Sequence, residues 1–161
     1  MSRKEQLAWI ISGTALTAFI VLQFLPVWWF VPSTNLSNPP VLSEIRWNAP
    51  ETAAVMERSC YMCHSNETRL PLYMQIAPLS WMAAQRVNDA RTHLNFSEQH
   101  ANQIDAAEII ESIENGVMPP PLYLLLHPEA RLSDGEKAQL IAGIRATLSG
   151  IAREHTAKSD S

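Results

Sequence analysis

No Asp, Glu, Lys or Arg occurs from Gln6 to Ser43, and within this stretch Leu7 to Val31 is a mostly apolar run of 25 residues. The hydrocarbon core of a bilayer needs about 20 such residues in helical form. Trp9 lies near one end of the run and Trp28 and Trp29 lie near the other, as in the aromatic belts of membrane surfaces. The sequence therefore predicts one membrane-spanning helix, and we expect residues 7–31 to contact the lipid bilayer.

The basic residues predict the orientation of this helix. Arg3 and Lys4 precede the apolar run, and the next basic residue is Arg46. Because basic residues concentrate on the cytoplasmic side of a membrane, we expect a single-pass protein with a cytoplasmic N-terminus. A cleaved signal peptide is the alternative, but its apolar region is normally about 7–15 residues long and ends at a small-residue cleavage site. The run in this chain is longer, and Val31-Pro32-Ser33 is a poor cleavage site.

The chain divides into an anchor, taken as residues 1–31, and three further parts. Three prolines among Ser and Asn residues predict an extended, Pro-rich linker over 32–45. A domain over 46–153 follows, and then a short polar tail over 154–161. We also expect Pro26 to bend or end the anchor helix near its outer end.

Apolar residues of the domain recur at helical spacing between Pro-containing loops, and no stretch alternates apolar and polar residues for long. This pattern predicts an all-α fold with no sheet. The expected helices run from Pro50 towards Ser59, from a cap at Ser80 to about Leu94, over Ile104–Ile113 with Gly116 as the stop, and from the Ser133–Glu136 capping box to near Gly150.

Composition excludes several classes of protein. The net charge of the chain is −4, so it lacks the basic surface that nucleic-acid binding needs, and no nucleic-acid partner is expected. Two cysteines are too few for a disulfide-rich scaffold or for a four-cysteine zinc site.

Cys60-Tyr61-Met62-Cys63-His64 is a C-x-x-C-H motif, the attachment signature of a c-type haem. On one helical turn the two cysteines lie on the same face, where each can form a thioether with a haem vinyl group. Haem is attached on the outer side of energy-transducing membranes, which is the side that the anchor predicts for this motif. We therefore expect one covalent haem c, held by Cys60 and Cys63, with His64 as the proximal iron ligand.

Three other interpretations of the motif stay open. A thioredoxin-like redox pair expects a βαβ context, which the sequence lacks. A zinc site of two cysteines and two histidines would draw on His64, His93, His100 or His127, whose spacing does not match the usual short pair. A structural disulfide is the third interpretation, in an oxidising compartment.

Met118 is the expected sixth ligand of the iron. It follows Asn115-Gly116-Val117 and precedes Pro119-Pro120-Pro121, so a glycine stop and a stiff proline run hold its side chain in place. A methionine ligand would raise the reduction potential relative to a second histidine. His93, His127 and an open site are the alternatives.

The motif and several segments after it resemble the bacterial haem-binding domain family, a group of membrane-anchored or exported single-haem proteins. The resemblance covers roughly residues 42–148 and implies a cytochrome-c-like helical domain with thioethers on Cys60 and Cys63 and with His64 and Met118 as iron ligands. It rests on Cys60–Ser65, Pro71-Leu72-Tyr73, Pro78–Trp81, Leu94–Ser97, Ile113–Pro119, Tyr123, His127 and Leu132-Ser133.

One position departs from the family. Members often carry a His-Val pair in the helix after Ser-Trp, where this chain has Arg86-Val87, so a ligand role there is in doubt. Arg86 and Arg91 are expected on a solvated helix face rather than paired with haem propionates.

These features predict a membrane-anchored mono-haem c-type cytochrome that transfers electrons on the periplasmic side of a bacterial inner membrane, rather than an enzyme. Its partners would be the bilayer and a redox partner protein or membrane complex. One alternative is a haem-carrying accessory subunit of a larger respiratory or photosynthetic complex. Another is a small haem peroxidase or gas sensor, which would need an open sixth site.

Overall fold

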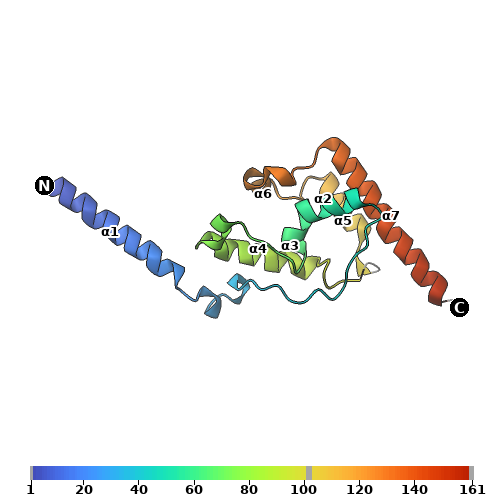
Figure 1. Cartoon of the computed structure of the whole chain (residues 1–161), viewed down its shortest axis with the longest axis horizontal. Helices are drawn as coiled ribbons and strands as arrows, with labels where there is room; N and C mark the ends of the chain where they lie inside the picture. The colour runs from blue at the N-terminus through green and yellow to red at the C-terminus, as the bar shows by residue number, and fades with distance from the viewer. Residues whose placement is uncertain (1, 101–102, 160–161) are drawn as a thin grey trace. The chain divides into compact units, whose positions relative to one another are not determined.

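The computed structural model describes residues 2–100 and 103–159, and every regular element among these residues is a helix (Figure 1). The prediction of an all-α chain is therefore confirmed. The chain forms two compact units. The first comprises the chain up to Leu36 together with Leu70–Arg86, and the second comprises Ser37–Arg69 and the chain from Val87 onward.

The first unit begins with α1 (Arg3–Gln23), a helix of 21 residues in which no residue is buried. Its Ser2 N-cap and Glu5 form a capping box, with reciprocal hydrogen bonds of 2.6 and 3.3 Å. At about 1.5 Å per residue the helix is about 31 Å long, close to the hydrocarbon thickness of a bilayer. By length and composition α1 could cross a membrane, although a signal sequence has the same properties.

The predicted effect of Pro26 is confirmed, because α1 ends at Gln23, before this proline. The regular helix is therefore shorter than the apolar run in the sequence. Trp28 and Trp29 lie beyond it, in the 3₁₀ turn η1 (Val27–Trp29), and a second 3₁₀ turn, η2 (Pro32–Thr34), follows.

A side-chain amide joins α1 to the other segment of the first unit. Gln23 Nε2 donates to the Ala77 carbonyl oxygen at 3.3 Å, and Gln23 Oε1 accepts from the Ala77 backbone N–H at 2.9 Å. Ala77 follows the 3₁₀ turn η4 (Leu72–Gln75) and precedes α4 (Leu79–His93). Ser80 lies inside α4 rather than at its N-cap, so the predicted cap is wrong by at least one residue.

The first helices of the second unit form one continuous segment made of three parts. They are α2 (Pro50–Met56), a five-residue π-helical turn η3 (Glu57–Tyr61) and α3 (Met62–His64). Pro50 lies in the first turn of α2, where its missing N–H costs no hydrogen bond. The helix predicted to run towards Ser59 therefore continues through the whole C-x-x-C-H motif.

The remaining helices of the second unit are α5 (Ala106–Glu114), α6 (Pro121–Leu126), the 3₁₀ turn η6 (Pro128–Ala130) and α7 (Asp134–Ser159). Asp105 caps α5 by accepting from two backbone N–H groups, so Ile104 precedes the helix. Gly116 has a φ of +68°, which confirms its predicted role as the stop after α5.

The predicted capping box at the start of α7 is confirmed. Glu136 Oε2 accepts from the Ser133 N–H at 2.9 Å, and the Glu136 N–H donates to Ser133 Oγ at 3.3 Å. Together with an ion pair to Arg58 at 2.8 Å, these bonds lower the pKa of the Glu136 carboxyl from its ordinary 4.5 to about 2; the backbone bond to Ser133 is the largest contribution. The predicted end near Gly150 is wrong, because α7 continues to Ser159; the last two residues of the expected tail lie outside the described residues.

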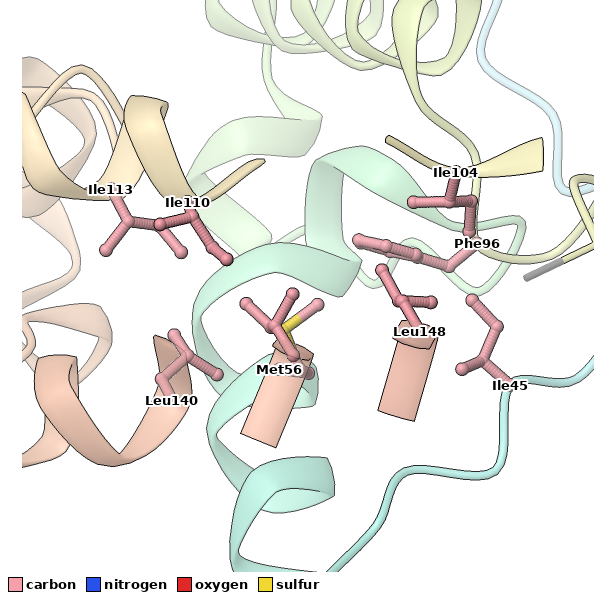
Figure 2. Packing of buried hydrophobic residues seen from close by; sticks show 9 residues of the cluster. Ile45, Met56, Phe96, Ile104, Ile110, Ile113, Leu140 and Leu148 are labelled. Atoms are coloured by element: carbon pink, nitrogen blue, oxygen red, sulfur yellow. The ribbon is translucent and has the colours of Figure 1, made fainter. Parts of the chain in front are cut away.

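The core of the second unit gathers side chains from α2, α5, α7 and the loops around Phe96 (Figure 2). Met56 and Ile144 are completely buried within it. The cluster consists of Ile45, Met56, Phe96, Ile104, Ile110, Ile113, Leu140, Ile144 and Leu148. Because Met56 lies one turn before the cysteine motif, this core holds the helix that carries the motif.

Close contact between α2 and α7 depends on Gly143. A Cβ atom at this position would lie 2.6 Å from Thr52 Cγ2 and 3.0 Å from Thr52 Cβ. Real Cβ atoms essentially never approach other atoms as closely as the first of these distances. The absence of a side chain therefore lets the two helices meet at this point.

The second half of the expected linker is not a free tether. The backbone N–H groups of Leu42 and Ser43 both donate to the Ser97 carbonyl oxygen, at 2.7 and 3.0 Å. Ile45 is only 6% exposed and belongs to the core. Residues 37–45 are thus held by the second unit, which the sequence pattern of prolines and polar residues did not predict.

Candidate functional site

The three residues of the predicted attachment motif lie on consecutive turns of one helical segment. Cys60 belongs to the π-helical turn η3, and Cys63 and His64 belong to α3. Both cysteines are free thiols and neither is fully exposed. The motif therefore presents two unbonded sulfur atoms and an imidazole within a single short stretch of helix.

Backbone groups from another part of the chain orient His64. Its Nδ1 lies 3.0 Å from the Leu94 carbonyl oxygen, and its own carbonyl oxygen accepts from the Phe96 N–H at 2.8 Å. A carbonyl oxygen can only accept, so Nδ1 carries the proton and Nε2 keeps its lone pair. Burial lowers the pKa of His64, although the Leu94 bond opposes this effect. The imidazole is therefore neutral at pH 7, which is the form that binds a metal.

The thiols respond to burial in the opposite sense. Burial, and to a smaller extent the neighbouring Cys63, raises the pKa of Cys60 to about 12. Burial also raises the pKa of Cys63, while the Arg91 guanidinium lowers it. Both thiols are therefore protonated at pH 7.

Aromatic side chains connect the motif to the core. The Phe96 ring stacks on Tyr61 with centroids 5.4 Å apart and lies edge-on to His64 at 6.3 Å. Trp47 Nε1 donates to the Tyr61 hydroxyl at 3.0 Å, and the Trp47 ring meets Phe96 edge-on. Phe96 is thus a buried core residue that contacts His64.

Polar side chains hold the loop that follows His64. Asn66 is 3% exposed, and its Oδ1 accepts from Asn95 Nδ2 at 2.9 Å. The Asn66 backbone N–H donates to Ser97 Oγ at 2.9 Å, and Asn95 Oδ1 accepts from the Ser97 N–H at 3.0 Å. The segment Leu94–Ser97 therefore uses each of its four residues to position His64 or the loop after it.

Arg91 extends this network to the linker. Its guanidinium donates to the carbonyl oxygens of Ser65 and Ser37, at 2.8 and 2.6 Å. It also donates to Asn38 Oδ1 and Thr68 Oγ1, at 2.8 and 2.9 Å. The prediction that Arg91 lies on a solvated helix face is therefore wrong, because its side chain forms hydrogen bonds with both the linker and the loop after His64.

The candidates for a sixth ligand lie on separate elements of the chain. Met118 follows the Gly116 turn, and its N–H donates to the Ser112 carbonyl oxygen at 3.0 Å. Its side chain is 38% exposed. His93 ends α4 and is exposed. The sixth ligand therefore stays a prediction.

His127 is buried and engaged by its neighbours. Its Nδ1 lies 3.0 Å from a Glu129 carboxylate oxygen, and its ring stacks on Tyr123 with centroids 4.3 Å apart. The Tyr123 hydroxyl donates to the sulfur of Met62, inside the C-x-x-C-H motif, at 3.1 Å. Tyr123 therefore connects α6 to the motif, whereas His127 contacts the Glu129 side chain of η6.

A protein-ligated metal site finds no support in the described ranges. Among residues 2–100 and 103–159, no group of three or more His, Cys, Asp or Glu side chains could hold a metal ion. The zinc alternative, which needs four such ligands, therefore has no site within this part of the chain.

Comparison with known families identifies the chain. The haem-binding domain family matches it over residues 17–146. The chain belongs to this family. The match begins inside α1, ends inside α7 and includes every element of the site described above. No curated protein and no solved structure matches the chain.

Membership of the haem-binding domain family supports haem as the cofactor of this chain. The residues fit such a group, because a neutral imidazole with its Nδ1 proton engaged is the usual form of a metal-binding histidine. Sequence reasoning missed the Leu94 carbonyl, Asn66 and the hydrogen bonds of Arg91. The family resemblance of Leu94–Ser97 marks the segment that contacts His64 and Asn66, but no local pattern indicates the individual contacts or the bonds of Arg91.

Proposed function

We propose that this member of the family is a membrane-anchored mono-haem c-type cytochrome that transfers electrons on the periplasmic side of a bacterial inner membrane. One observation carries the proposal: His64, with its Nδ1 bonded to Leu94, lies on the same helical segment as the free thiols of Cys60 and Cys63. A histidine that only stabilised the fold would not need two cysteines in this spacing.

In this proposal Cys60 and Cys63 would hold a haem through thioethers, and His64 Nε2 and the Met118 sulfur would bind its iron. The bound haem supplies a reversible one-electron change at its iron. The chain contributes rigid ligands, because Leu94 and Phe96 fix the imidazole and the Gly116 turn restrains the loop before Met118. Fixed ligands keep the coordination nearly unchanged between oxidation states, which suits electron transfer.

The anchor supports the membrane part of the proposal. No residue of α1 is buried and all but the half-buried Leu22 are exposed, and Arg3 and Lys4 lie at its N-terminal end. A helix with no buried face in the described chain needs an apolar surrounding, and a bilayer provides it. The anchored protein would then keep its site close to membrane partners.

Attachment is tested by expressing the chain with haem-maturation machinery and staining a denaturing gel for haem. The wild-type band should stain, and Cys60→Ser with Cys63→Ser should lose the stain. Intact mass of the membrane fraction should give the whole 18.0 kDa chain plus one haem. A band that never stains would refute covalent attachment, and loss of the first 30 or so residues would identify a signal sequence.

The distal ligand is tested by optical spectra of the ferric protein. Met118→Ala should convert a low-spin spectrum to a high-spin one, whereas the neighbouring Val117→Ala should not. Val117 is the matched control because it shares the loop and is 57% exposed. A wild-type protein that is already high-spin would instead favour a peroxidase or gas sensor, and an unchanged Met118→Ala spectrum would exclude Met118 as the ligand.

A further inference from the structure

The segment that pairs with the end of α1 is unusual in composition and exposure. From Leu70 to Gln85 the chain carries no Asp, Glu, Lys or Arg, and Arg69 and Arg86 flank the stretch. Five of its large hydrophobic side chains are exposed, by 39–77%. They are Leu72, Tyr73, Ile76, Leu79 and Met82.

The contact with Gln23 sets the depth of this segment relative to the anchor. Along a helix with about 1.5 Å rise per residue, Gln23 lies about 30 Å from Lys4, which equals the hydrocarbon thickness of a bilayer. If Lys4 lies at the cytoplasmic surface, Gln23 lies at the outer boundary of the hydrocarbon. Ala77 is held there too, because its N–H and carbonyl oxygen both bond the Gln23 amide.

The hydrogen bonding of this pair suits the membrane boundary. An amide side chain and a backbone peptide at the edge of the hydrocarbon each need a polar partner, since water is scarce there. Gln23 and Ala77 satisfy one another, and Gln75 Nε2 donates to the Leu70 carbonyl oxygen at 2.8 Å. These amide and peptide groups are therefore bonded internally, while the apolar side chains named above remain exposed.

We propose that residues 70–85 form a second membrane contact, lying in the outer interfacial layer beside the end of α1. Leu72, Ile76, Leu79 and Met82 enter the boundary between headgroups and acyl chains. Arg69 and Arg86, at the ends of the uncharged stretch, lie among the headgroup phosphates. This inference rests on the membrane anchoring proposed above.

The test measures depth in the full-length, haem-loaded protein in phosphatidylglycerol–phosphatidylethanolamine vesicles. Ile76→Cys and, separately, Leu72→Cys carry a nitroxide label, whose accessibility to oxygen and to a water-soluble nickel chelate gives its depth. Ile11→Cys is the lipid control, and the exposed Glu111→Cys is the water control. The parent chain should take up no label, because its two cysteines are held in thioethers.

Labels at positions 72 and 76 should lie within about 5–10 Å of the phosphate level, with oxygen accessibility well above that at position 111. Water accessibility equal to that at position 111, with lipid accessibility at position 11, would overturn the second contact and leave the anchor intact. Water accessibility at position 11 would show that the anchor proposal itself has failed. A changed haem spectrum with a water-exposed label would show that the segment faces the haem, which also overturns the proposal.

Discussion

Gly143 offers a prediction in which local and tertiary effects have opposite signs. A glycine inside a helix is about 1 kcal/mol less favourable than alanine, so the sequence alone predicts that Gly143→Ala stabilises α7. In the structure the new methyl group would meet the buried Thr52 side chain on α2, including Thr52 Cβ at 3.0 Å. Rotating the Thr52 side chain moves Oγ1 and Cγ2, but Cβ is attached directly to the backbone and stays at 3.0 Å, so the backbones must also move apart by a few tenths of an ångström.

The expected magnitude follows from these two terms. Overpacking costs about 1–3 kcal/mol, and a contact with a backbone-attached atom belongs at the upper end of that range. After subtracting the propensity gain of about 1 kcal/mol, Gly143→Ala should lower the free energy of unfolding by about 2 kcal/mol. The haem-loaded protein in detergent can be unfolded with urea while far-ultraviolet circular dichroism is recorded.

Two variants make the experiment decisive. Gly135→Ala is the matched control, because it lies in the same helix and its new methyl group would meet nothing within 4 Å. It should leave the stability unchanged or raise it by up to about 1 kcal/mol. Thr52→Ala, combined with Gly143→Ala, should recover part of the loss, with a coupling of about 0.5–3 kcal/mol. If Gly143→Ala stabilises the protein as much as Gly135→Ala does, the close approach of α2 and α7 is refuted.

Three further predictions concern polar groups. Asn95→Ala leaves the Asn66 oxygen and the Ser97 N–H buried without this partner and should cost about 2–4 kcal/mol in the same urea assay; a loss below 0.5 kcal/mol or so would show that water replaces the amide. Ser59 Oγ is buried with no hydrogen-bond partner among the residues that the structure describes, so Ser59→Ala should raise the stability by about 1 kcal/mol, and a loss would reveal an unrecognised partner. The pKa of Glu136 is lowered in the folded state, so its carboxylate stabilises the fold above its ordinary pKa of 4.5, and this contribution is lost as the pH falls towards 2. Glu136→Gln should therefore flatten the decline in melting temperature between these pH values, and an equally steep decline would contradict the assignment.

Local signals predicted several features of the fold correctly. The Ser133–Glu136 capping box, the stop at Gly116 and the end of α1 before Pro26 all depend on residues close together in the chain. The predicted cap at Ser80 and the predicted end at Gly150 failed. α7 extends past a glycine that the sequence marked as a stop, because a helix can accommodate a glycine at modest cost.

The candidate site residues are visible in the sequence, whereas the groups that position them are not. The spacing of Cys60, Cys63 and His64 is visible in the sequence, whereas the Leu94 carbonyl that bonds His64 is a backbone group with no sequence signature. The hydrogen bonds of Arg91 were equally unpredictable from the sequence, because its partners lie 23 to 54 residues away and include two carbonyl oxygens. Contacts of this length depend on tertiary structure, which local patterns do not encode.

The π-helical turn at Glu57–Tyr61 changes which substitutions the motif can tolerate. A turn of this kind holds one residue more than an α-helical turn, and each helical residue advances the direction of a side chain by about 100°. An α-helical turn with the same number of residues would therefore point the side chains after it in another direction, so the wider turn helps to aim His64 at Leu94. Removing Glu57, Arg58 or Ser59 would leave the motif intact in the sequence and would let the turn close to an ordinary α-helical one, with the helix after it facing the same way as before. The segment just before Cys60 should therefore tolerate a one-residue deletion that the motif itself cannot.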